Sequence, residues 1–146
     1  MLVLILICLV ALLLNLVLQL GAIALGIRIS MPLKHADSPT LLEGIRILGV
    51  LVTVLFFGHL FQIAVWATLF LGVGAIDDFA TAFYHSTVNY SSLGYGDVVM
   101  EHPWRLAGAL EACTGVMMFG VSTATLFAAL SHLLRARHGI TERGKV

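Results

Sequence analysis

The sequence has few charged residues, few prolines and almost no cysteine. Only 11% of its 146 residues are charged and 60% are hydrophobic, whereas about a quarter of the residues in soluble domains are charged. This balance excludes an ordinary soluble domain and indicates a membrane protein. Cys8 and Cys113 both lie within apolar runs, so we expect packing residues rather than a disulfide or a metal site.

Several functional motifs are also missing. Arginine does not recur at every third position, which argues against a voltage sensor, and no glycine-rich phosphate loop is present. Glu111 with His59 is the only pair that invites a catalytic interpretation, and it lacks a metal-ligand spacing. We therefore expect no enzyme activity, no cofactor and no nucleic-acid partner. A chain of this length also leaves no room for a nucleotide-binding or calcium-binding domain.

The first apolar stretch, residues 1–29, is interrupted only by Asn15 and Gln19 before Arg28 at its end. As a helix it would be roughly 40 Å long, which exceeds the hydrocarbon core of about 30 Å. The two amides lie one turn apart and mark a face that contacts protein rather than lipid. A cleaved signal peptide is the alternative, but no positive residue precedes the run, and the run exceeds the usual length of about 7 to 15 residues.

Two further membrane helices are predicted at residues 42–73 and 104–134, after a polar linker at 30–41 and before a basic tail at 135–146. Lys and Arg near membrane ends mark the cytoplasmic side. We therefore place the linker and the tail in the cytoplasm and the N-terminus outside the cell membrane.

Between these two helices lie residues 77–90, an amphipathic segment too short to span, and residues 91–97, Ser-Ser-Leu-Gly-Tyr-Gly-Asp. Glycine here alternates with Leu93 and Tyr95, which allows successive carbonyl oxygens of an extended strand to point to one side. The pattern predicts a re-entrant helix followed by a loop that presents a line of carbonyl oxygens.

Residues 42–134 resemble the pore-loop potassium channels of the bacterial two-transmembrane type, whose filter reads Thr-Val-Gly-Tyr-Gly-Asp. Ser92 stands at the Thr position, Leu93 at the Val position, and Gly94 to Asp97 match. The resemblance implies an all-α membrane protein with three transmembrane helices, the first of them additional to the family unit, a re-entrant pore helix and a filter loop. Since one chain carries one filter strand, it also implies a homotetramer in the lipid bilayer.

The resemblance further implies passive, selective conduction of K⁺, which is the permeant ion rather than a cofactor. The residues implied to bind it are Ser92, Leu93, Gly94, Tyr95 and Gly96. The alternative is a nonconducting or auxiliary membrane subunit that keeps the filter sequence as structure.

The resemblance also implies roles for other single residues of this chain. Tyr84 is expected to bond Asp97, and either His85 or Asn89 is expected to hold the hydroxyl of Tyr95. On the last helix, the expected hinge, pore-lining and gate residues are Gly115, Gly120, Phe119, Thr123 and Phe127.

The intramembrane polar residues are His59, Gln62 and Glu111. His59 and Gln62 share one face of the second helix with Trp66. An unpaired acid at the depth of Glu111 costs several kcal/mol, so we expect it to face the second helix or the back of the pore helix. Its expected partner is Trp66, Gln62 or a hydroxyl such as that of Ser86, and both a structural bond and a pH sensor remain open.

Overall fold

The computed structural model describes residues 1–30 and 40–143 of the chain. This part forms the helices α1 (Leu2–Ser30), α2 (Leu41–Gly72), α3 (Phe79–Tyr90) and α4 (Arg105–Arg143). Within the described residues, α1, α2 and α4 are long and apolar enough to cross a membrane, and no strand occurs. The predicted all-α membrane fold is therefore confirmed. Most of the predicted linker, residues 31–39, lies outside the described residues.

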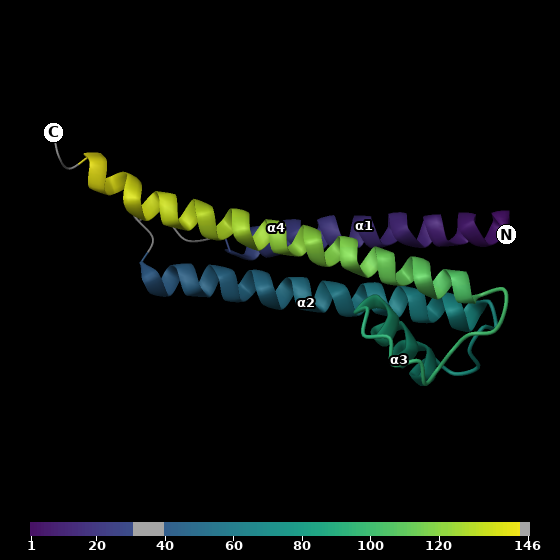
Figure 1. The fold of residues 1–146 in the computed structure, drawn as a ribbon. Helices are drawn as coiled ribbons and strands as arrows, with labels where there is room; N and C mark the ends of the chain where they lie inside the picture. The colour runs from purple at the N-terminus through teal and green to yellow at the C-terminus, as the bar shows by residue number, and fades with distance from the viewer. Residues whose placement is uncertain (31–39, 144–146) are drawn as a thin grey trace.

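The three long helices run alongside one another, and α3 lies beside one end of α2 (Figure 1). α1 and α4 run in one direction and α2 in the other, so the N-terminus lies at the same end of the bundle as α3 (Figure 1). α1 and α3 each pack against both α2 and α4. The loop that follows α3 is thereby held at the end of the bundle where α1 begins.

The helix ends follow local sequence signals. Thr40 and Glu43 form a capping box at the start of α2, and the Asp78 carboxylate accepts a hydrogen bond from the Thr81 amide at 2.9 Å at the start of α3. At the end of α2, Gly74 adopts a φ of 68°. Its amide and that of the next residue bond back into the last turn, which is the Schellman arrangement.

The last helix is longer than the sequence predicts. Residues 135–146 are expected to form a basic tail, but α4 continues to Arg143. The apolar part ends earlier, at about Ala136. Charged residues end a membrane span without ending a helix, and this stretch contains no proline to break it.

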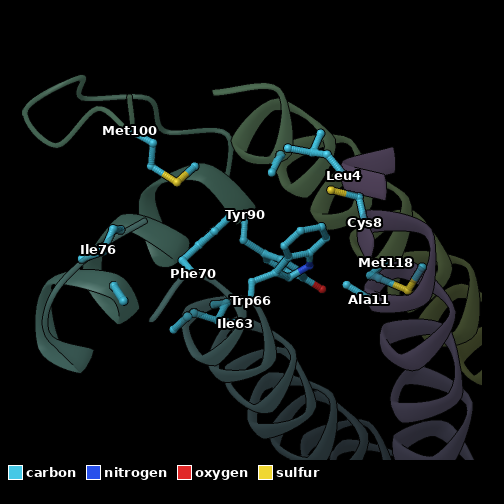
Figure 2. Packing of buried hydrophobic residues seen from close by; sticks show 13 residues of the cluster. Leu4, Cys8, Ala11, Ile63, Trp66, Phe70, Ile76, Tyr90, Met100 and Met118 are labelled. Carbon is cyan, nitrogen blue, oxygen red and sulfur yellow. The ribbon is translucent and has the colours of Figure 1, made fainter. Parts of the chain in front are cut away.

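The hydrophobic core contains residues from all four helices, including the end of α3. Trp66, Phe70 and Tyr90 are fully buried, and Figure 2 shows their rings close together, with Met118 nearby on α4. The rings of Trp66 and Phe70 lie 5.8 Å apart. Tyr90 is the last residue of α3, so the core fixes the point from which the following loop departs.

Gly115 allows α4 to approach that point. A Cβ atom built on Gly115 would lie 1.9 Å from the carbonyl oxygen of Tyr90. Backbone, unlike a flexible side chain, cannot move aside cheaply. Gly115 is expected from the sequence to be a hinge residue, whereas in the structure it is a position where α4 packs directly against the last residue of α3.

Gly115→Ala should lower stability, because the added methyl group forces α4 away from Tyr90. Overpacking of this kind costs about 1–3 kcal/mol or more. Thermal unfolding of the detergent-solubilised protein measures the effect. Gly120→Ala is the matched control, since a Cβ at Gly120 meets no atom within 4 Å, and it should be neutral or slightly stabilising. Equal midpoints for the two variants would contradict the packing role of Gly115.

Candidate functional site

The loop at residues 91–97, called the glycine loop below, alternates between two backbone conformations. Ser92, Gly94 and Gly96 have φ values of 59°, 63° and 74°, whereas Leu93 and Tyr95 between them do not have positive φ. Such alternation turns consecutive carbonyl groups toward one side of the strand. The left-handed conformation of Ser92 is not expected from the sequence, because residues other than glycine seldom adopt it.

The start of the glycine loop is tied to the end of α3 through its amides. The amides of Leu93 and Gly94 both donate to the carbonyl oxygen of Val88, at 2.9 and 3.4 Å, and the amide of Ser92 donates to that of Asn89 at 2.8 Å. Within the described residues, none of the carbonyl oxygens from Ser92 to Gly96 accepts a backbone hydrogen bond. These oxygens are therefore available to ligands, and the whole loop is exposed in a single chain.

Asp97, the last residue of the glycine loop, is held by α3. The hydroxyl of Tyr84 donates to the Asp97 carboxylate at 2.6 Å, which is the contact expected from the sequence. This hydrogen bond favours the charged carboxylate and lowers the pKa of Asp97 below its usual value, while it raises the pKa of Tyr84. The loop thus ends in an acid whose charged form is favoured by a hydrogen bond from α3.

His85 and Asn89 contact each other rather than Tyr95; His85 also packs on α2, and Asn89 also bonds Glu111 of α4. The amide nitrogen of Asn89 lies 3.2 Å from Nδ1 of His85, and the His85 ring packs edge-on against Phe70 with centroids 5.6 Å apart. Tyr95 is 68% exposed, and within the described part of one chain it bonds neither residue. The expected support of the Tyr95 hydroxyl is therefore not made within a single chain.

Glu111 is fully buried and turned toward the back of α3. Its Oε2 atom accepts a hydrogen bond from the side-chain amide nitrogen of Asn89 at 3.5 Å. The Ser86 hydroxyl lies beside the carboxylate but does not form a hydrogen bond with it. The orientation agrees with the sequence expectation, but two of the expected partners are wrong. Gln62 bonds elsewhere, and the Trp66 indole nitrogen has no partner among the described residues.

A cavity of about 440 Å³ lies behind the glycine loop. Its walls include Gly94 and Gly96 of the loop, His85 and Asn89 of α3, and Gly108 of α4. In the described part of the chain, no Phe, Tyr or Trp side chain lines it. The back of the loop therefore meets aliphatic, small and polar groups of its own chain rather than a layer of aromatic rings.

The expected pore-lining residues on α4, Phe119, Thr123 and Phe127, are only partly exposed in a single chain. Thr123 is exposed and Phe127 is 70% exposed, as expected for residues that line a surface. Phe119 also packs inward, with its ring centroid 4.6 Å from His59 and 5.5 Å from Tyr90.

Five buried polar side chains, contributed by all four helices, form a closed ring of hydrogen bonds. Its members are Gln19, His59, Gln62, Tyr90 and Ser122. The burial of Gln19 agrees with the expected protein-facing side of the first helix. Tyr90 and Ser122 were not expected to be functional residues. The available signal was the position of Tyr90, directly before the glycine loop.

Comparison with known proteins places these elements in a family. A family model described as "Ion channel" matches residues 47–132, which is more than half of the chain and runs from α2 into α4. The comparison with curated proteins and the comparison with solved structures each gave no match. The matched residues include the glycine loop, the helix before it and the two helices that flank it. The chain therefore belongs to the ion channel family.

Proposed function

We propose that this protein is a potassium-selective channel that conducts K⁺ passively through a filter formed by the glycine loops of four chains. The observation that carries the proposal is the alternating backbone from Ser92 to Gly96, with carbonyl oxygens that accept no backbone hydrogen bond in the described part of one chain. Rings of such oxygens replace the hydration shell of K⁺. In this proposal K⁺ binds at the carbonyl oxygens of Ser92, Leu93, Gly94 and Tyr95, and the Ser92 hydroxyl completes the innermost ion site.

The distribution of charge supports an orientation for the channel. The acids Asp77, Asp78, Asp97 and Glu101 lie in the loops beside α3, at one end of the bundle, whereas Arg28, Arg46 and Arg135 lie toward the other end. Basic residues at membrane ends favour the cytoplasm. We therefore propose that the glycine loop and the N-terminus face outward and that the end of α4 faces the cytoplasm. The outer acids would then concentrate cations at the mouth.

We further propose that α4 lines the path below the filter. Phe119, Thr123 and Phe127 recur at every fourth position, and the exposed Phe127 lies farthest from the glycine loop along α4. A ring of four phenylalanines can close a pore by excluding water. Gly120, at which a Cβ would meet no atom within 4 Å, is the proposed hinge above this constriction.

Gly96→Ala should abolish K⁺ flux into liposomes. Gly96 has a φ of 74°, and a side chain at such an angle costs roughly 1–2 kcal/mol in each of four chains. Gly72→Ala is the control, because Gly72 ends a helix and a Cβ there meets no atom within 4 Å. Unchanged K⁺ selectivity in Gly96→Ala would contradict the filter assignment. A parent protein that carries no K⁺ would support the nonconducting subunit instead.

Native mass spectrometry of the purified protein should show four chains per complex. The physical reason is that one chain supplies one side of an ion cage and leaves residues 91–97 exposed. Spectra recorded over a range of collision energies separate the native complex from products of dissociation. A dimer as the only stable oligomer would contradict the proposal.

Tyr84→Phe should change how conduction responds to acid on the outer side. Because the Tyr84 hydroxyl lowers the pKa of Asp97, the carboxylate keeps its charge until the pH falls below its ordinary pKa. Without that hydroxyl the pKa rises, so protonation and the accompanying fall in conductance begin at a higher pH. Single-channel recording against outer pH measures this shift.

Asp97→Asn provides the control for that experiment. It carries no titratable group at this position and should lack the component of the acid response that Tyr84→Phe displaces. An identical acid response in the parent and in Tyr84→Phe would contradict the role assigned to the bond.

A further inference from the structure

The closed ring of buried polar side chains joins α1 to the residue from which the glycine loop departs. Gln19 of α1 donates to the Ser122 hydroxyl of α4 at 2.8 Å and accepts from the Gln62 amide of α2 at 2.9 Å. The Tyr90 hydroxyl donates to Gln62 at 2.7 Å. His59 closes the ring, with Nδ1 3.1 Å from the Tyr90 hydroxyl and Nε2 2.9 Å from that of Ser122.

With the side-chain amides of Gln19 and Gln62 oriented as they are in the structure, the donors and acceptors of this ring fit together in one direction. The Tyr90 hydroxyl donates to Gln62, so its oxygen accepts a hydrogen bond from the N–H group at Nδ1 of His59. In neutral His59 the other nitrogen, Nε2, then accepts from the Ser122 hydroxyl, whose oxygen accepts from Gln19. Every member donates once and accepts once around the ring. Bonds arranged head to tail in this way polarise one another, so the loss of one member weakens the others.

The ring acts on the end of α3. Tyr90 is the last residue of that helix and is fully buried, and its carbonyl group is the one that packs against Gly115. Its side chain is therefore fixed by the ring and its backbone by α4. Ser92, the first residue of the glycine loop with positive φ, follows two positions later. A shift of the Tyr90 side chain would move the base of the glycine loop.

Gln19 is the one residue of the ring that lies outside the region matched by the ion channel family model. The family model begins at residue 47, within α2, and α1 contributes only Gln19 to the ring. Gln19 is fully buried and bridges α2 and α4, which both pack against α3. This inference rests on the proposed channel function. We propose that Gln19 is a positioning residue for the filter, which acts on Tyr90 through Gln62 on one side and through Ser122 and His59 on the other.

A purely structural role for Gln19 predicts a different result from a positioning role. If Gln19 only holds α1 against the bundle, its loss lowers stability and leaves ion selectivity unchanged. If Gln19 positions the filter, its loss alters the spacing of the carbonyl cages and therefore the K⁺/Na⁺ permeability ratio, even in complexes that stay assembled.

The test compares Gln19→Met with Asn15→Leu in the full-length protein reconstituted in planar bilayers. Each replacement is apolar and close to the original side chain in shape. Asn15 is the matched control because it lies one turn away on α1, is equally buried, and donates only to the Ala11 carbonyl of its own helix, at 2.8 Å. The readouts are the K⁺/Na⁺ permeability ratio and the oligomer by native mass spectrometry.

Gln19→Met should lower the permeability ratio by about 3-fold to 15-fold, the factor that corresponds to one interhelical hydrogen bond in a membrane. Asn15→Leu should keep the parent ratio. Ser122→Ala removes only a hydroxyl and breaks the same link from α4, so it should reproduce the Gln19→Met effect, and it serves as the test if Gln19→Met does not assemble.

The failures of the two proposals are distinguishable. If the parent is K⁺-selective and Gln19→Met and Ser122→Ala both keep its ratio, the positioning role is overturned while the channel function stands. If the parent itself does not prefer K⁺, the proposed function is overturned, and the role of Gln19 falls with it.

Discussion

The contact between the end of α3 and α4 is the constraint on which the rest of the structure depends. The Tyr90 carbonyl lies where a side chain at position 115 would have to be, so the close packing of the two helices requires glycine there. Once Tyr90 is fixed, the Val88 carbonyl is in place to hold the amides of Leu93 and Gly94. The proposed filter therefore takes its position from a contact between two backbones.

Polar side chains hold the bundle together where the hydrophobic effect contributes little. Lipid tails are as apolar as leucine, so helices within a membrane associate through close packing and interhelical hydrogen bonds. The ring that contains Gln19 and Tyr90 meets this need with each donor paired to an acceptor. Glu111 is different, since one of its carboxylate oxygens has no partner among the described residues. Buried polar groups without a partner are few in native structures, and Glu111 lies against the helix that leads into the proposed filter.

Local patterns allowed much of the fold to be predicted from the sequence, but contacts between distant residues were not predictable. Hydropathy placed the helices to within a residue or two at most ends, and the Gly-Tyr-Gly run located the loop. The link between Gln19 and Ser122 joins positions far apart in the chain, and no periodicity encodes it. The expected bond between Glu111 and Gln62 is not made, because Tyr90 and Gln19 already occupy the side-chain amide group of Gln62. Hydropathy and spacing do not show which partner a buried amide chooses.

In the proposed channel, the alternating backbone from Ser92 to Gly96 selects K⁺ over Na⁺. The most direct test is the reversal potential of the purified parent protein in a planar bilayer, with K⁺ on one side and an equal concentration of Na⁺ on the other. The proposed filter gives a large reversal potential with the K⁺ side negative, because K⁺ leaves that side and little Na⁺ replaces it. A reversal potential near zero, which means equal permeability to the two ions, would contradict it.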